Sequence, residues 1–361
     1  MSKRIICGTD VHEKTLVSKI AVGTGIPEDK EHRNTHTGRG QLITHLKRLA
    51  REYNAEEIVV AYEASTLGYS LYDDCREAGI VCYILAPTKM PRSPKDRKKK
   101  RDKEDAKRIL ELLRAHLLAG NELPAIWIPD DQTRDDRELI RQRLAVAHKI
   151  TVIKTQVQML LKRHGLKRPE WIQSSWTRAY CRWLERCPLE KGARFALSSL
   201  LRQLSGLEQE CIILDRAVEA LSQDSRYKAA VVSLTRLKGV ALLTAMVYLT
   251  ELGDLGRFCN RRKVGSFLGL VPSTHESGQK DDRKGHITRE GPKLVRKVLC
   301  QATWARIRYD HQEAAVYGRI CHKNPKHKKI AVVASMRRLA ILMWHVGLEA
   351  QEKSQVFTKA A

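Results

Sequence analysis

Four acidic residues in the first third of the chain are the candidates for chemistry. Asp10 lies at the end of an expected strand, Glu63 directly follows the apolar run 57–62, and Asp102 and Asp105 lie three residues apart at the start of an expected helix. Strand ends carry active-site groups in α/β sheets, and positions i and i+3 share one helix face. Converging carboxylates without basic partners would repel one another, and hard cations relieve that repulsion. The quartet therefore predicts a site for two Mg²⁺ ions, which can stabilise the attacking and leaving oxygens of a phosphodiester.

A run of positive charge leads into the last two acids. Between Lys89 and Lys103 nine of fifteen residues are basic, and Pro91 and Pro94 exclude a helix there. We expect a loop that orders on nucleic acid and brings it to the metals, with a solvated charge run as the alternative. Simple helix capping is the alternative role for the acids that follow, because carboxylates in a first helical turn also favour the helix dipole. The predicted nucleic-acid contacts in this run are Lys95, Arg97, Lys98, Lys99, Lys100 and Arg101.

The composition of the whole chain also indicates a polyanionic partner. Its 361 residues include 66 lysines and arginines against 41 acidic residues, a formal net charge of +25. Nucleic acid or an anionic membrane could neutralise this excess. The longest apolar stretches, 240–249 and 330–346, are too short or too interrupted for a spanning helix of about 20 residues, and the amino terminus lacks the apolar core of a signal peptide. We therefore expect nucleic acid and no membrane as the partner.

Cysteine usage is typical of a reducing compartment. The nine cysteines are odd in number and scattered, and no Cys-x-x-Cys pair occurs. This excludes the usual zinc-knuckle spacing and favours reduced thiols in a cytoplasmic protein.

The first 120 residues predict an α/β domain. Expected strands over 4–8, 16–22, 57–62 and 80–85 alternate with expected helices over 38–53 and 67–78. This β-β-α-β-α-β order is typical of a mixed sheet flanked by helices. A further helix is expected from Asp102, with Ile109, Leu110, Leu112, Leu113 and Leu117 on its apolar side.

The middle of the chain predicts two long helices. Apolar residues repeat there at alternating spacings of 3 and 4, which is the seam of a coiled coil. The helices could form an antiparallel hairpin within one chain or pair between chains; we favour a hairpin that also supports oligomer contacts. The stretch between them, with Trp171, Trp176 and Trp183, predicts a small helical tip whose aromatic rings serve packing. The seam residues are Val146, Ile150, Ile153, Val157 and Leu160, then Leu197, Leu200, Leu204, Leu207, Cys211, Leu214, Val218 and Leu221.

The last third predicts a second, mainly helical domain. Helices are expected over 234–252, with a turn at Gly239, and over 264–270, 293–309 and 331–347, while 272–289 reads as a loop. A glycine-rich basic loop among apolar helices can meet a phosphate backbone. Its predicted contacts are Lys280, Arg283, Lys284 and Arg289.

These motifs together resemble a known family. The acids lie in Gly8-Thr9-Asp10-Val11-His12, Tyr62-Glu63-Ala64 and Arg101-Asp102-Lys103-Glu104-Asp105-Ala106, and they are followed in order by residues 253–258, 269–272, 275–278 and 289–291. The ordered set, which covers nearly the whole chain, is similar to the DEDD-motif insertion-sequence transposases, a bacterial family that includes bridge-RNA-guided recombinases and Piv-type invertases. Two departures are Arg101 directly before Asp102, where the family usually has threonine, and Gly239-Val240-Ala241, where it has Gly-x-Gly.

The resemblance implies the fold. It indicates a RuvC-like (RNase H-like) α/β amino-terminal domain over 1–125, a helical coiled-coil region over 126–225, and a mainly α carboxy-terminal transposase domain over 226–361. The RuvC-like and serine-bearing domains of one active site could come from different subunits of a homodimer or tetramer.

The resemblance also implies a nucleophile. Ser277, in His275-Glu276-Ser277-Gly278, matches the serine that attacks the scissile phosphate and forms a phosphoserine link to DNA. A serine hydroxyl needs a base or a metal to activate it, and Gly278 allows the backbone to approach a phosphate. Ser273 and Ser266 are the rival serines, and His275 could orient the nucleophile or simply belong to a turn.

The expected function is a DNA transposase or recombinase that exchanges strands between donor and target DNA, in a bacterial cytoplasm at the nucleoid. By resemblance its partners include a structured non-coding guide RNA. The alternatives are a metal-dependent nuclease of the Holliday-junction type that uses water, a Piv-like site-specific invertase, and a non-catalytic nucleic-acid-binding scaffold.

Overall fold

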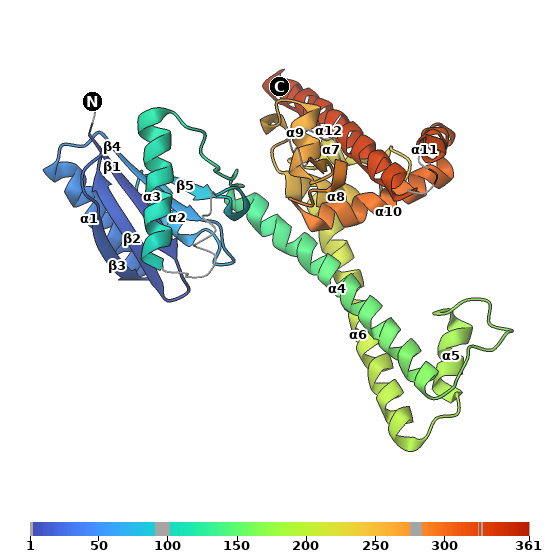
Figure 1. Cartoon of the computed structure of the whole chain (residues 1–361). Helices are drawn as coiled ribbons and strands as arrows, with labels where there is room; N and C mark the ends of the chain where they lie inside the picture. The colour runs from blue at the N-terminus through green and yellow to red at the C-terminus, as the bar shows by residue number, and fades with distance from the viewer. Residues whose placement is uncertain (1–2, 91–101, 275–283, 324, 326–327, 361) are drawn as a thin grey trace. The chain divides into compact units, whose positions relative to one another are not determined.

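The computed structural model describes residues 3–90, 102–274, 284–323, 325 and 328–360, apart from the side chains of Asp102, Thr274, Lys284 and 354–360. The chain divides into two compact units, Met1–Ile128 and Pro129–Ala361 (Figure 1). Each unit is described by itself. The predicted separation of the second unit into a middle and a carboxy-terminal domain stays a prediction.

The first unit is a five-stranded sheet covered by helices. The strand order is β3-β2-β1-β4-β5, with β1, β4 and β5 parallel and β2 antiparallel to both of its neighbours. This mixed sheet is consistent with the predicted α/β RuvC-like domain. The elements are β1 (Arg4–Val11), β2 (Thr15–Val22), β3 (Glu28–Arg33), α1 (His36–Glu52), β4 (Glu57–Glu63), α2 (Ser70–Glu77), β5 (Val81–Leu85), the single turn η1 (Pro87–Lys89) and α3 (Asp102–Ala119).

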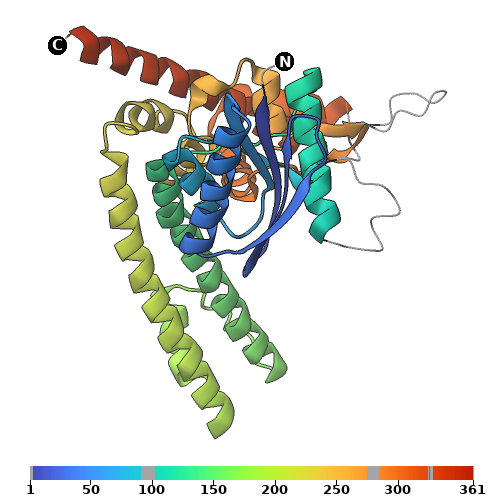
Figure 2. The same ribbon diagram turned by 90° about the vertical axis from the view of Figure 1, so that its left-hand side faces the viewer.

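Each face of the sheet has its own core, because side chains alternate between the two faces along a strand. One face of β1 and β4 packs against the apolar sides of α1 and α2. The opposite face packs against α3, and Figure 2 shows α3 across the sheet from the other two helices. The α3 side of the core includes Ile6, Val59, Ala61, Ile109, Leu110 and Leu113.

The sequence interpretation of this unit missed one strand. The segment 28–33, Glu-Asp-Lys-Glu-His-Arg, forms the edge strand β3, paired only with β2 among the described strands. It contains no apolar residue, so hydrophobic alternation could not reveal it. Charged side chains are typical of an exposed sheet edge, where they discourage pairing with other chains.

The second unit begins with a long helical hairpin. Helices α4 (Asp131–Arg163) and α6 (Lys191–Ser222) lie side by side, and their connection contains the short helix α5 (Arg178–Arg186), which lies at the tip beside the end of α4 (Figure 1). Ion pairs of Arg143 with Asp215 and of Lys154 with Glu208 show that the two helices run antiparallel. The predicted intrachain hairpin is therefore observed. The coiled-coil character of its seam stays a prediction.

The rest of the second unit is a helical core of α7 (Lys228–Thr235), α8 (Leu242–Leu252), the turn η3 (Leu255–Arg257), α9 (Arg261–Phe267), α10 (Lys293–Tyr309), α11 (His311–Lys323) and α12 (Lys328–Ala360). Two expectations are corrected here. The segment 272–289 is not entirely loop, because β6 (Pro272–Thr274) pairs with β7 (Lys284–Ile287). Helix α11 was not predicted, and its mixed polar sequence buries only Glu313 fully.

Helix α12 is the one helix in the described residues that is long and apolar enough, by length and composition, to cross a membrane. The segment that meets this criterion is 328–353, with a mean hydropathy of 1.3. It includes the interrupted apolar stretch 330–346. Half of that window is buried within the protein, where Met336, Leu339, Ala340 and Met343 belong to the core of the unit. Such burial is typical of a core helix.

Candidate active site and basic groove

Asp10 and Glu63 are neighbours on the two central parallel strands. Strands β1 and β4 are in register up to Thr9 opposite Tyr62, so the next residue of each strand is one of these acids. Both acids project to the face that α3 covers, because Ile6 and Ala61, which share their alternation, pack against α3. The sheet thus places two carboxylates side by side at its carboxyl edge, as the sequence predicted for strand ends.

Helix α3 brings the other two acids to the same edge. It runs antiparallel to β1, because Arg4 at the start of β1 donates a hydrogen bond from Nη1 to Leu117 O near the end of α3, at 3.1 Å. At Gly8 the two backbones almost touch, and a Cβ there would lie 2.6 Å from Ala106 O. The two strand residues from Gly8 to Asp10 span about 6.6 Å, which equals the rise of about four residues along a helix. Asp10 is therefore level with the first turn of α3, which contains Asp102 and Asp105.

Two basic side chains accompany these acids, which corrects the expectation that the acids converge without basic partners. His12 Nε2 lies 3.1 Å from Asp10 Oδ2, and Asp105 forms an ion pair with Arg108. Asp10 and Asp105 are both largely buried, with 14% and 18% of their side chains exposed. The spacing could have revealed both partners, since i and i+2 share a strand face and i and i+3 share a helix face.

The described side chains do not by themselves form a metal centre. Within residues 3–90, 102–274 and the later described segments, no three histidine, cysteine or acidic side chains form a group that could hold an ion. Asp102 lies in α3, but its side chain is outside the description. The donors that the fold brings to this edge are carboxylates, which suit a hard divalent cation. A metal site formed by the quartet stays a prediction that this placement supports.

Gly8 is a test of how α3 holds the acids. We expect Gly8→Ala to lower the free energy of unfolding by about 1–3 kcal/mol, because its methyl group would displace the α3 backbone. Chemical denaturation followed by circular dichroism measures this. Gly40→Ala is the matched control, because a Cβ at this position in α1 meets nothing within 4 Å and alanine favours a helix. Equal stability of the Gly8 and Gly40 variants would contradict the close packing of α3.

In the second unit, a large groove lies between α9, the β6–β7 hairpin and α12. It measures about 1970 Å³, and the apolar part of its lining includes Ile330, Val333 and Leu342. Its described lining contains one acid, Glu313. One carboxylate oxygen of Glu313 lies 3.7 Å from Arg306 Nε, and the other lies 3.7 Å from Arg338 Nε. The cationic side chains of the lining are Arg261, Arg262, Arg289, Arg306, Lys328, Lys329, Arg337 and Arg338.

Four of these cations lie at helix starts, where their position does not favour stability. Arg261 and Arg262 begin α9, and Lys328 and Lys329 begin α12, although the helix dipole favours acids in a first turn. The Arg337 guanidinium lies against Gly265 of α9, where an added Cβ would come within 2.9 Å of its Nε. The groove is therefore a basic surface suited to a polyanion.

Two of the motifs that carry the family resemblance, residues 269–272 and 289–291, pack closely against each other beside this groove. Gly269 has a positive φ of +62°, and a Cβ there would lie 2.6 Å from Glu290 O. Gly291, at φ +129°, is in similarly close contact with Phe267. Between these glycines Arg289 also adopts a positive φ of 58°, which is uncommon for arginine. This packing fixes the ends of the segment that carries Ser277 in the sequence.

Many predicted contact residues lie outside the described residues. These are Ser277 and His275, then Lys95, Arg97, Lys98, Lys99, Lys100, Arg101, Lys280 and Arg283. Lys284 lies in β7 without a described side chain, and Arg289 lines the groove. Of the rival serines, Ser273 donates a hydrogen bond from Oγ to His286 O at 3.0 Å, and Ser266 lies in α9.

Comparisons with known proteins find similar transposases over both units. A family model described as Transposase, for the DEDD type of insertion sequence IS110, matches residues 7–165, and a second, described as Transposase IS116/IS110/IS902 family, matches 232–318. A putative transposase of Sinorhizobium fredii is 33% identical over 249 residues, which is 69% of this chain and 58% of that protein. The transposase for insertion sequence element IS1533 of Leptospira borgpetersenii is 26% identical over 308 residues, covering 84% of this chain and 86% of the relative.

An α/β unit with acids at the ends of adjacent parallel strands and on the covering helix is consistent with a RuvC-like domain, the class found in nucleic-acid enzymes. With the matches over both units, the chain belongs to the DEDD insertion-sequence transposase family. Proteins of this family generally use a divalent metal ion. The chain matches less than two thirds of the length of the Sinorhizobium relative.

Proposed function

We propose that this protein is a DNA transposase that cleaves and exchanges DNA strands through a phosphoserine intermediate. The observation that carries the proposal is the register of β1 and β4, which makes Asp10 and Glu63 neighbours under the first turn of α3. Family membership and the basic groove of the second unit support it.

Asp10, Glu63, Asp102 and Asp105 are the residues that would hold the metal, proposed as two Mg²⁺ ions. The metal supplies Lewis-acid stabilisation of charge on the phosphate oxygens. The Arg108 cation offsets part of the negative charge at Asp105, and His12 Nε2 lies within hydrogen-bond distance of Asp10. They also fix the orientation of these two acids within the site.

In the proposed reaction the Ser277 hydroxyl attacks the phosphorus of the scissile phosphodiester. The serine proton leaves to a base, a phosphorus–oxygen bond to Ser277 forms, and the bond to one DNA strand breaks as its oxygen takes up a proton. The phosphoserine conserves the bond, so that a hydroxyl of another strand can reverse the step without a high-energy cofactor. The role of Ser277 as the nucleophile is proposed from its sequence motif, residues 275–278, and from the family resemblance.

The groove between α9 and α12 is proposed to bind the DNA backbone. We expect Arg261→Glu combined with Arg262→Glu to weaken duplex binding by about tenfold at moderate salt and to lower the salt dependence of binding, because phosphate contacts are lost. Fluorescence anisotropy at several salt concentrations measures both quantities. Lys149→Glu combined with Arg216→Glu, at exposed positions of α4 and α6 that do not line the groove, is the control with the same change of net charge. The groove assignment fails if the control weakens binding as much.

Further partners are proposed from the family resemblance. A structured non-coding RNA would pair with donor and target DNA, and the chain's charge of +25 suits both nucleic acids. A homodimer or tetramer is supported by apolar side chains that remain exposed along the hairpin, namely Val152, Met159, Phe195, Ile212 and Ile213.

A strand-exchange assay tests the function. The purified full chain is incubated with labelled donor and target DNA, the RNA transcribed from the segment beside its gene, and Mg²⁺. Joined donor–target products that require the chain and the metal are expected. Cleaved ends without joining would instead indicate a junction nuclease, and inversion between repeats without RNA would indicate an invertase. Absence of any cleavage would leave only a binding scaffold and overturn the proposal.

A further inference from the structure

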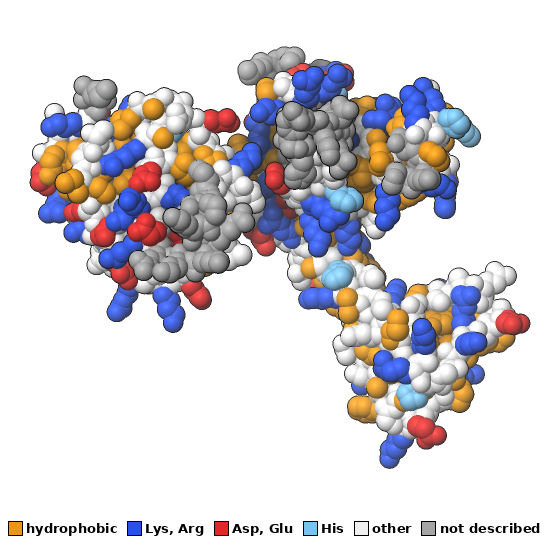
Figure 3. Space-filling view, viewed as in Figure 1, with side chains coloured by type: hydrophobic (Ala, Val, Ile, Leu, Met, Phe, Trp, Pro, Cys, Tyr) orange, Lys and Arg blue, Asp and Glu red, His pale blue; other side chains and the backbone are white. Residues whose placement is uncertain are grey.

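The tip of the α4–α6 hairpin is a basic region that the proposed reaction does not use. Residues 161–194 contain nine lysines and arginines against three glutamates, Glu170, Glu185 and Glu190. Figure 3 shows Lys and Arg side chains spread over this tip at the lower right. Such an excess of charge in a small helical tip is costly through self-repulsion unless a polyanion lies against it.

Most aromatic rings of the tip have structural roles. Tyr180 packs against Trp176 and Trp183, with ring centroids 5.5 Å apart in each pair, and the Lys154 ammonium lies 5.2 Å from the Trp176 ring centroid. These contacts confirm the prediction of packing for Trp176 and Trp183. Trp171 is different, because 70% of it is exposed. An exposed indole beside cations can stack on an unpaired base.

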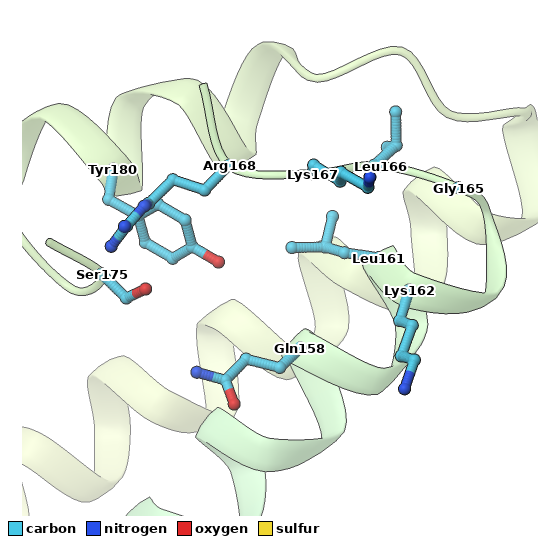
Figure 4. A pocket seen from close by; sticks show the side chains of 9 residues that line it. All are labelled: Gln158, Leu161, Lys162, Gly165, Leu166, Lys167, Arg168, Ser175 and Tyr180. Carbon is cyan, nitrogen blue, oxygen red and sulfur yellow. The ribbon is translucent and has the colours of Figure 1, made fainter. Parts of the chain in front are cut away.

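A pocket lies next to Trp171 in the chain, between the end of α4, the following turn and α5. It measures about 490 Å³, and its described lining contains no acid. Figure 4 shows the Tyr180 hydroxyl pointing across the pocket towards Leu161, with Arg168 and Ser175 on the α5 side and Lys162 on the α4 side. The polar lining is Gln158, Lys162, Lys167, Arg168, Ser175 and Tyr180.

These polar groups can all donate hydrogen bonds, three of them with a positive charge, and phosphate oxygens accept such bonds. Burial raises the pKa of Tyr180, although the Arg168 cation opposes the shift, and the hydroxyl is protonated at neutral pH as in an ordinary tyrosine. The pocket is therefore matched to an anion rather than to a cation or a neutral apolar ligand.

The tip is remote from the groove of the same unit. Near its start α4 is tied to α8, where Arg137 donates hydrogen bonds to the carbonyls of Thr250 and Glu251 at 2.7 and 2.9 Å. From there the remaining helix, up to Arg163, extends about 40 Å. A ligand at the tip thus contacts a separate surface from a strand in the groove.

We infer that the hairpin tip binds a single-stranded nucleic-acid segment, with a backbone phosphate in the pocket of Lys162, Lys167 and Arg168 and an unpaired base stacked on Trp171. The shared chemistry is a phosphodiester next to an exposed base, which RNA and DNA both provide. The inference goes beyond the proposed strand exchange and relies on it only for the presence of nucleic acid.

The test uses the full chain and fluorescein-labelled 12-nucleotide single-stranded RNA, single-stranded DNA and duplex DNA. Trp171→Ala is expected to weaken binding of a single strand by about tenfold, because one base loses its stacking partner, and Trp171→Phe restores part of it. Lys167→Glu combined with Arg168→Glu is expected to weaken it by about tenfold and to lower the salt slope. The preferred strand, RNA or DNA, identifies the source of the ligand.

A matched control and a local readout separate the tip from other binding surfaces. The control is Lys149→Glu combined with Arg216→Glu, at exposed positions of the same two helices that do not line the pocket. Photo-crosslinking of 5-iodouridine strands, mapped by mass spectrometry, should label Trp171. The inference is overturned if tip variants bind single strands as the control does, or if crosslinks avoid the tip. Strand exchange by the tip variants on saturating DNA is measured in parallel. Binding tests the inference and strand exchange tests the proposed function, so failure of one can be distinguished from failure of the other.

Discussion

Ser277→Ala is expected to abolish the covalent protein–DNA adduct and to lower strand exchange by about 10³-fold or more. The reason is chemical: alanine has no hydroxyl, so the phosphorus–oxygen bond that conserves the cleaved linkage cannot form, and nucleophile removals in other enzymes cost this much or more. The measurement is a denaturing gel of the protein trapped on end-labelled DNA, followed by mass spectrometry of the DNA-linked peptide.

The two rival serines provide the controls. Ser273→Ala removes a hydrogen bond to His286 O within the β6–β7 hairpin, and Ser266→Ala changes the surface of α9. Both variants should keep the adduct. An adduct that survives in the Ser277 variant, or that disappears in the Ser273 variant alone, would assign the nucleophile elsewhere. DNA cleavage without an adduct in the unmodified protein would favour a water-using nuclease.

The sequence predicted the parts of the acidic site that depend on strong periodicity. The strand β4 (Glu57–Glu63) contains a continuous apolar run and ends in an acid, and α3 begins at Asp102 as expected. The neighbouring positions of Asp10 and Glu63 required the strand order, because β1 could have paired with either β4 or β5. Only the structure shows that β1 and β4 are parallel partners in register.

Other features could not be predicted because their residues satisfy no hydrophobic pattern. The strand β3 is entirely charged or polar, and its pairing with β2 comes from backbone hydrogen bonds and the ion pair of Lys19 with Asp29. The basic groove likewise joins α9, β7 and α12, which are far apart in the sequence. Its cations come together through tertiary packing, so no local motif marks them.

Asp10→Asn and Glu63→Gln are each expected to lower Mg²⁺-dependent cleavage by about 10³-fold. Both changes keep the size of the side chain while removing the negative charge that a hard cation requires from its ligands. Cleavage of labelled DNA as a function of Mg²⁺ concentration is the measurement. A removed ligand should raise the metal concentration needed for half-maximal rate, whereas a merely structural residue should not. Nucleic-acid binding in the absence of metal should stay unchanged.

Glu57→Gln is the control within the same strand. Glu57 lies at the opposite end of β4 and forms a partly exposed ion pair with Arg4, whose loss costs about 0–1 kcal/mol of stability. This variant should therefore cleave normally at the same Mg²⁺ concentration. If Asp10→Asn retained cleavage within about threefold of the unmodified protein, the acids at this edge could not be the metal ligands. The neighbouring positions of Asp10 and Glu63 would then only reflect the polar end of a buried strand pair, and the metal would have to bind elsewhere.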